Sequence, residues 1–154
     1  FHRESLEIKR DLDDRAGEAK SLGNLGVVAR RRREYDEAER FHRESLEIKR
    51  DLDDRAGEAT SLNNLGLVAQ RREEYEEAIT HYEEAATIFA EIGALRELLT
   101  TFRNLYDVAV ATDDEGRAIE WCDRALDTIE SADPDLRDER LTFEVRRARL
   151  DDSL

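Results

Sequence analysis

The sequence lacks methionine, and it has only one cysteine, one proline and no long apolar run. Because Cys122 is alone, no disulfide can form within the chain, and no group of cysteines and histidines has the spacing of a zinc site. No stretch approaches the roughly 18 consecutive apolar residues of a membrane span, and no charged and apolar leader opens the chain. We therefore expect a soluble, cytoplasmic protein. Since methionine is absent and the chain opens inside a helical pattern, we also expect it to be a piece of a longer protein.

Basic residues are outnumbered, with 25 lysines and arginines against 39 aspartates and glutamates and a net charge of -14. This acidity disfavours non-specific binding to nucleic acid or to an anionic membrane surface. Only Lys9, Lys20 and Lys49 are lysine. An arginine-rich, strongly acidic chain resembles the proteins of salt-loving archaea, although a GC-rich genome alone would also favour arginine over lysine.

The sequence repeats itself at an interval of 40 residues. The segment FHRESLEIKRDLDDRAGEA occupies residues 1–19 and recurs unchanged at 41–59, and residues 20–40 match 60–80 at 13 positions. A fixed period of this size indicates a solenoid or array in which each unit buries its apolar face on its neighbour.

Each unit has the pattern of a helical hairpin. Apolar residues recur at helical spacing on both sides of a short polar break. Gly26 and Gly66 fall inside the first helix, where glycine costs roughly 1 kcal/mol relative to alanine, so we expect a close approach of the second helix there. Ala38 and Ala78 offer the matching small surface. The pattern predicts helices at 1–13, 17–32, 35–52, 57–72, 75–92, 95–111, 115–131 and 135–151.

The spacing of these landmarks resembles the tetratricopeptide repeat. One unit reads Asn24-Leu25-Gly26, Tyr35, Ala38, Ser45, and the next reads Asn64-Leu65-Gly66, Tyr75, Ala78, Ala85. The 40-residue form is similar to repeats in kinesin light chains and Pins-type G-protein-signalling modulators. The resemblance implies an all-α fold, a right-handed α-solenoid of stacked antiparallel hairpins. It divides residues 1–154, a single array, into the second helix of a truncated repeat (1–15), two repeats (16–55 and 56–94), a degenerate repeat (95–132) and a capping helix (133–154).

The degenerate repeat and the cap depart from the pattern. Tyr106 replaces the glycine and Cys122 replaces the central aromatic or histidine, so we expect a looser hairpin or one opened by Tyr106. Asp133 and Pro134 form a helix start signal. In the last helix Leu136, Phe143 and Leu150 recur every seven residues and are expected to lie on the preceding hairpin, with a charged outer side.

The sequence contains little that indicates a catalytic or metal-binding site. His2 and His42 share one repeat position and His81 is one residue away from it, so packing is the better interpretation of all three. Cys122 is interpreted as a packed small hydrophobe. Phosphate-binding loops, HExxH and nucleophile elbows are missing. We expect no enzyme, no cofactor and no metal. We assign the recurring carboxylate runs Asp11-Leu12-Asp13-Asp14 and Asp51-Leu52-Asp53-Asp54, which lie between units, to helix capping and solvation.

The first helices carry a more informative pattern, a stripe spaced by 4, 3 and 4 residues. The resemblance implies that this stripe lines a concave groove and that its asparagines hold the backbone of a bound peptide. Arginines at its end would add a basic site for carboxylates. The predicted peptide-binding residues are Lys20, Asn24, Val27, Arg31, Asn64, Leu67, Arg71 and Asn104. The alternative is that the asparagines only tie neighbouring helices together and the arginines only offset acidic surface.

Our leading hypothesis is thus a protein-interaction scaffold that binds an extended, acidic peptide segment of a partner. The competing hypothesis is a structural or sensor arm of a larger signalling ATPase or transcription regulator. Because the chain opens with a second helix, Leu6, Ile8 and Leu12 are expected to present an apolar edge that favours self-association through this helix.

Overall fold

The computed structural model of the chain describes residues 2–11, 14–132 and 136–152, with the side chains of residues 8–11 excepted. Within these ranges the secondary structure is entirely helical, without strands. Eight helices follow one another: α1 (His2–Asp11), α2 (Arg15–Arg31), α3 (Tyr35–Asp51), α4 (Arg55–Arg71), α5 (Tyr75–Ile92), α6 (Leu95–Ala111), α7 (Glu115–Ala132) and α8 (Arg137–Asp152). The predicted all-α fold is confirmed. The predicted bounds agree to within about two residues, and the start signal at Asp133 and Pro134 lies outside the described residues.

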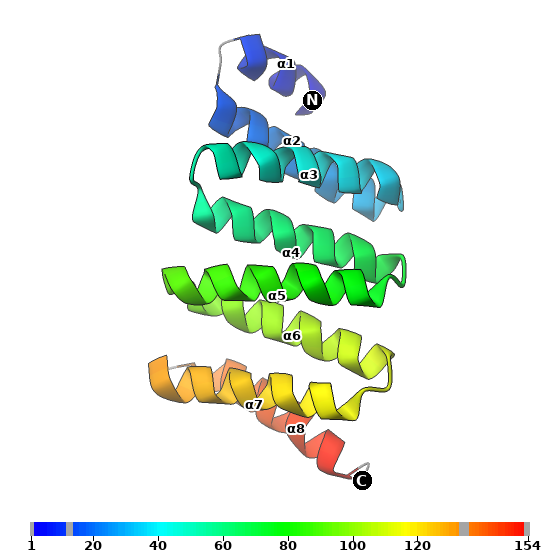
Figure 1. Cartoon of the computed structure of the whole chain (residues 1–154), viewed down its shortest axis with the longest axis vertical. Coiled ribbons are helices and arrows are strands. Elements are labelled where there is room, and N and C mark those ends of the chain that lie inside the picture. The colour runs from blue at the N-terminus through cyan, green and yellow to red at the C-terminus, as the bar shows by residue number, and fades with distance from the viewer. Residues whose placement is uncertain (1, 12–13, 133–135, 153–154) are drawn as a thin grey trace. The chain divides into compact units, whose positions relative to one another are not determined.

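The helices group into two compact units, residues 1–93 and residues 94–154. In the first unit, consecutive helices from α1 to α5 run back and forth and pack side by side, and α2 also touches α4 (Figure 1). In the second unit, α7 packs against both α6 and α8. Each predicted hairpin is therefore a pair of adjacent antiparallel helices, as a helical repeat requires.

Helix ends are set by residues that recur with the 40-residue period. The carboxylates of Asp14 and Asp54 accept hydrogen bonds from the backbone N–H groups of Gly17 and Gly57, each at 2.9 Å, so they cap α2 and α4 as predicted. The turns after α2 and α4 each contain a left-handed residue, Arg33 (φ 64°) and Glu73 (φ 62°). Neither is glycine or asparagine, the residues that usually adopt this conformation, so the sequence carried no signal for it.

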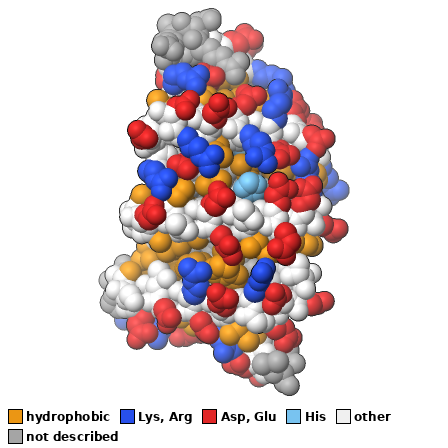
Figure 2. Space-filling model, in the orientation of Figure 1, with side chains coloured by type: hydrophobic (Ala, Val, Ile, Leu, Met, Phe, Trp, Pro, Cys, Tyr) orange, Lys and Arg blue, Asp and Glu red, His pale blue; other side chains and the backbone are white. Residues whose placement is uncertain are grey.

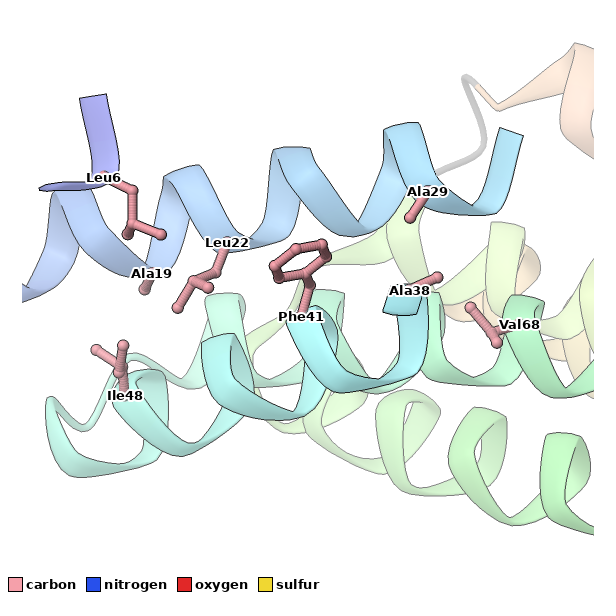
Figure 3. Packing of buried hydrophobic residues seen from close by; sticks show 8 residues of the cluster. All are labelled: Leu6, Ala19, Leu22, Ala29, Ala38, Phe41, Ile48 and Val68. Carbon is pink, nitrogen blue, oxygen red and sulfur yellow. The ribbon is translucent and has the colours of Figure 1, made fainter. Parts of the chain in front are cut away.

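Interlocking apolar side chains form the core of the first unit (Figure 3). Leu6 of α1 packs near Ala19 and Leu22 of α2, while Phe41 and Ile48 of α3 enter from the other side. Leu6 is only 8% exposed. It is therefore not part of the exposed apolar edge predicted for α1, because α2 covers it. The side chains of Ile8 and Leu12, the other predicted members of that edge, lie outside the described residues.

Gly26 and Gly66, at equivalent positions of the two repeats, lie directly against the second helix of their hairpin, as predicted, but their nearest neighbours are rings and not the predicted Ala38 and Ala78. A Cβ atom added to Gly26 would lie 2.5 Å from the ring of His42, and one added to Gly66 would lie 2.5 Å from the ring of Tyr82. Both rings are fully buried. Glycine is required at these positions because a large ring on the second helix occupies the space that any side chain would fill.

The second unit has a different core. Tyr106 of α6 stands where the glycines stand, and Cys122 of α7 stands where the rings stand; both are buried. The backbones of α6 and α7 approach each other at fewer points than those of α2 and α3, so the expected looser hairpin is found. Phe102 and Trp121 stack with ring centroids 5.8 Å apart and fill the wider space.

The last helix covers the second unit with one face. Leu136, Phe143 and Leu150 are buried, as their seven-residue spacing predicts. The prediction of a charged outer side was wrong in part, because Leu141 and Val145 are 59% and 43% exposed. Their i, i+4 spacing places them on one face of α8, away from the residues that the heptad pattern buries.

Candidate peptide-binding surface

Seven of the eight predicted peptide-binding residues lie in the first unit, on two helices that touch each other. We call these seven the groove stripe: Lys20, Asn24, Val27 and Arg31 of α2, with Asn64, Leu67 and Arg71 of α4. The predicted eighth residue, Asn104, lies half-buried on α6 in the second unit, which is described by itself.

The members of the groove stripe reach the surface. Lys20, Asn24, Arg31 and Arg71 are exposed, and the other three are half-buried. They face away from the helix sides that carry Leu22, Ala29 and the internal glycines, because a spacing of 4, 3 and 4 residues keeps them on one side of the helix.

The asparagines of the groove stripe are not used to join helices. Neither the side chain of Asn24 nor that of Asn64 makes a hydrogen bond with a described residue. Each amide therefore presents a donor and an acceptor to the surroundings. This observation weakens the alternative in which these two residues only tie neighbouring helices together.

Many arginines of the first unit form ion pairs. On or beside the second helices, Arg43 pairs with Glu39 at 2.8 Å, Arg50 with Glu58 at 3.2 Å, and Arg72 with Asp36 and Glu39. At the starts of the first helices, Arg15 pairs with Glu18 at 3.4 Å and Arg55 with Glu58 at 3.1 Å. On the face that Figure 2 shows, basic side chains accordingly lie among acidic ones. By contrast, Lys20, Arg31 and Arg71 form no ion pair with any described residue.

Charge also differs between the first and second helices of the hairpins. Together, α2 and α4 carry six basic and two acidic side chains, whereas α3 and α5 carry four basic and eleven acidic ones. In a strongly acidic protein, α2 and α4 thus carry a net positive charge. The overall net charge of -14 gave no sign of this segregation.

His42, His81 and Cys122 are buried or half-buried between helices, in agreement with the interpretation of these positions as packing residues. His42 is fully buried, and burial, followed by the charges of Arg30 and Lys49, lowers its pKa to about 4. Burial also lowers the pKa of His81. Burial raises the pKa of the Cys122 thiol to about 11, so at neutral pH it is protonated and a poor nucleophile.

One polar detail of the hairpins was missed from the sequence. The hydroxyl of Tyr82 donates a hydrogen bond to Oε1 of Gln70 at 2.8 Å. One period earlier, the same two positions hold His42 and Arg30, and both ring nitrogens of His42 and Nε of Arg30 are buried without a hydrogen-bond partner among the described residues. The joint change of both positions between repeats was the signal that could have revealed the pairing.

No three metal-ligating side chains gather in a metal-holding group within the described ranges. None of the helices described here combines the length and the apolar character that a membrane crossing needs.

Comparison with known proteins supports the assignment of the fold. Residues 1–51 and 57–131 match the model of the tetratricopeptide repeat family. Among curated proteins none matches the chain.

Several solved structures share the fold at low sequence identity. BtubC from P. vanneervenii is 20% identical, with a TM-score of 0.81 over 97% of this chain and 62% of its own. Nearly identical repeats of a putative kinesin light chain from Podosopora anserina are 14% identical, with a TM-score of 0.79 over 97% of this chain and 73% of theirs. A signal transduction ATPase with a tetratricopeptide repeat sensor, from Pyrococcus horikoshii, is 20% identical, with a TM-score of 0.81 over 97% of this chain and 23% of its own.

The chain thus spans about three fifths of the length of BtubC and about half of that of RapI, another protein of similar structure. The family match covers well over half of the chain, and the all-helical fold agrees with it. The chain belongs to the tetratricopeptide repeat family, whose members generally act as protein-interaction scaffolds.

Proposed function

We propose that this chain binds an extended, acidic segment of a partner protein along the groove stripe. The observation that carries the proposal is the unpaired state of Lys20, Arg31 and Arg71 on an exposed surface, in a protein that engages many of its other arginines in ion pairs. Charges without a partner in the free protein are available to a ligand, and their pairing with carboxylates adds affinity and steers association.

The chemistry of the groove stripe suits a peptide in extended conformation. Asn24 and Asn64 occupy equivalent positions on adjacent helices, so their amides would bind backbone groups of the ligand irrespective of its side chains. Val27 and Leu67 are half-buried and offer apolar contact beside the amides. Arg31 and Arg71 end the stripe, where their planar guanidinium groups would bind carboxylates in bidentate fashion.

A screen of short synthetic peptides with graded content of aspartate and glutamate, followed by titration of the hits, tests the proposal. We expect Asn64→Ala to weaken binding by roughly 1 kcal/mol, because backbone hydrogen bonds are lost. Arg71→Glu should weaken the binding of acidic peptides more than that of neutral ones. This loss of affinity should shrink as the salt concentration rises, because charge interactions are screened.

The matched control is Arg33→Glu. Arg33 is exposed and lies outside the groove stripe, and the next repeat already has Glu73 at the equivalent position with nearly the same backbone conformation. The control should therefore fold normally and leave binding unchanged. Equal losses of peptide affinity for Arg33→Glu and Arg71→Glu would show that only the overall charge matters, and they would contradict the proposal. Unfolding of the Asn64→Ala variant would show that this asparagine has a structural role, which would also contradict it.

A sensor or structural arm within a larger protein is the second candidate. This candidate is favoured by the similarity to the ATPase with a tetratricopeptide repeat sensor. The region that matches this chain makes up 23% of the length of that ATPase. The two candidates can be separated in the protein that the native gene encodes. Its catalytic or DNA-binding activity would be measured with and without an acidic peptide that binds this chain. A change in activity on peptide binding favours the sensor arm, and binding without such a change favours the scaffold.

A further inference from the structure

A cavity of about 210 Å³ lies between α6 and α8 in the second unit. Its floor is apolar and consists of Leu99 and Phe143, which are 3% and 2% exposed. The packing of the unit therefore fixes the floor of the cavity. Arg96, Thr100, Arg103 and Thr142, which line the rest of it, are exposed.

The rim of the cavity is polar and carries more positive than negative charge. From α6 come Arg96, Thr100 and Arg103, and from α8 come Glu139 and Thr142. Nη1 of Arg96 lies 3.7 Å from Oε1 of Glu139, a long contact between a side chain that is 79% exposed and one that is 34% exposed. Arg103 forms no ion pair within 4 Å with any residue that the structure describes.

Both threonine hydroxyls are oriented by their own helices. Thr100 Oγ1 donates to the carbonyl of Arg96 at 3.0 Å, and Thr142 Oγ1 donates to the carbonyl of Asp138 at 2.9 Å. Their protons are therefore engaged, and their oxygens remain acceptors. The donors left for a ligand are the guanidinium groups, which select an anion.

We propose that this cavity binds a carboxylate carried on a short apolar group. The carboxylate would pair with the guanidinium groups of Arg103 and Arg96, and the apolar group would rest on Leu99 and Phe143. The volume falls below the range of roughly 300 to 1,000 Å³ typical of drug-sized ligands, so the ligand is one small acid or one terminal residue of a peptide. This site lies in the second unit and does not depend on the groove stripe.

Titration of the isotopically labelled chain, followed by heteronuclear NMR, tests the proposal with isovalerate as the probe. Isovalerate should shift the resonances of residues around Leu99 and Phe143, and isovaleramide should not, because the amide lacks the charge. Arg103→Gln should raise the dissociation constant for isovalerate by about tenfold, because one charge-assisted hydrogen bond is lost. Glu139→Gln should instead tighten binding a few-fold, since it removes the carboxylate that competes for Arg96.

Arg117→Gln is the matched control, because Arg117 is a partly exposed arginine of α7 that lies outside the cavity. Equal effects of Arg103→Gln and Arg117→Gln would overturn the proposal, as would equal binding of isovalerate and isovaleramide. Tighter binding of inorganic phosphate than of isovalerate would also overturn it, since the apolar floor would then have no part. A leucine-terminated peptide with a free carboxylate distinguishes the source: tighter binding than isovalerate indicates a protein terminus, and weaker binding indicates a free acid.

Discussion

The hairpins of the two units solve the same packing problem in opposite ways. In α2 with α3, and in α4 with α5, a glycine on the first helix faces a large ring on the second, His42 or Tyr82. In α6 with α7 the large side chain is Tyr106, on the first helix, and the small one is Cys122, on the second.

This comparison shows that the two departures of the degenerate repeat from the family pattern are one compensated change. A ring without an opposing glycine would overpack the hairpin, and a cysteine opposite a glycine would leave a cavity. The exchange keeps the interior filled but moves the ring to the other helix, and the helix backbones then approach less closely.

The largest effect is expected from Gly66→Tyr, which places the residue of the degenerate repeat into a glycine hairpin. The new ring would occupy the space of Tyr82, whose carbon Cε1 lies 2.5 Å from the position of a Cβ at residue 66. We expect a loss of about 3 kcal/mol or more in the free energy of unfolding, measured in urea. Adding Tyr82→Cys should restore a good part of the loss, because the pair then matches Tyr106 and Cys122. If the double variant is no more stable than Gly66→Tyr alone, the ring cannot be moved to the first helix unless the helices are already as far apart as α6 and α7.

A second test compares the two glycine hairpins at acid pH. The pKa of His42 is about 4 in the folded chain and 6.5 in its ordinary state, so the unfolded chain binds the proton more tightly. The contribution of the neutral His42 side chain to the free energy of unfolding is therefore fully present above pH 6.5. It falls by up to about 3 kcal/mol as the pH drops from 6.5 toward 4. The double variant Arg30→Gln with His42→Tyr installs the hydrogen-bonded pair of the next repeat, Gln70 and Tyr82.

Free energies of unfolding of the double variant and of the unaltered chain, measured at several pH values, check this prediction. Carboxylates contribute to acid unfolding in both proteins, so the difference between the two curves isolates His42. We expect the difference to grow steadily below pH 6.5. A constant difference across this range would mean that His42 is protonated in the fold without cost.

The smallest effects are expected at the helix starts. Asp54 caps α4 through a hydrogen bond from Gly57 N at 2.9 Å, whereas the N-cap of α6 is Ala94, without a side-chain hydrogen bond. Asp54→Ala should lower the free energy of unfolding by about 1 kcal/mol, and Ala94→Asp should raise it by up to a similar amount. Thermal melts of the two variants against the unaltered chain measure both. A stabilising Asp54→Ala would contradict the capping role.

Much of the fold could be predicted from the sequence because the interactions that create it are local and periodic. Gly26, Ala38 and Tyr35 recur at 40-residue spacing in Gly66, Ala78 and Tyr75, and helical periodicity between them predicted every helix. The carboxylate runs that contain Asp14 and Asp54 lie between helices, and this place predicted a capping role for the runs. The structure then identified Asp14 and Asp54 as the capping residues.

The candidate sites could be predicted only in part. The positions of Lys20, Asn24 and Arg31 on one side of a helix follow from their spacing. Whether each is free or already paired depends on side chains that approach from other helices, as Arg72 shows by reaching back to Asp36 and Glu39 of the preceding helix.

The sequence by itself determined the repeat, the helices and the side of α2 and α4 that faces solvent, because helices and their sides depend on residues within a few positions of one another. Only the tertiary structure decided which polar groups meet across helices. It left His42 without a hydrogen-bond partner among the described residues, joined Tyr82 to Gln70, and brought Arg103 of α6 to the same cavity as Glu139 of α8. The physical reason is that such pairings depend on the register and separation of packed helices, which the side chains of both helices set together.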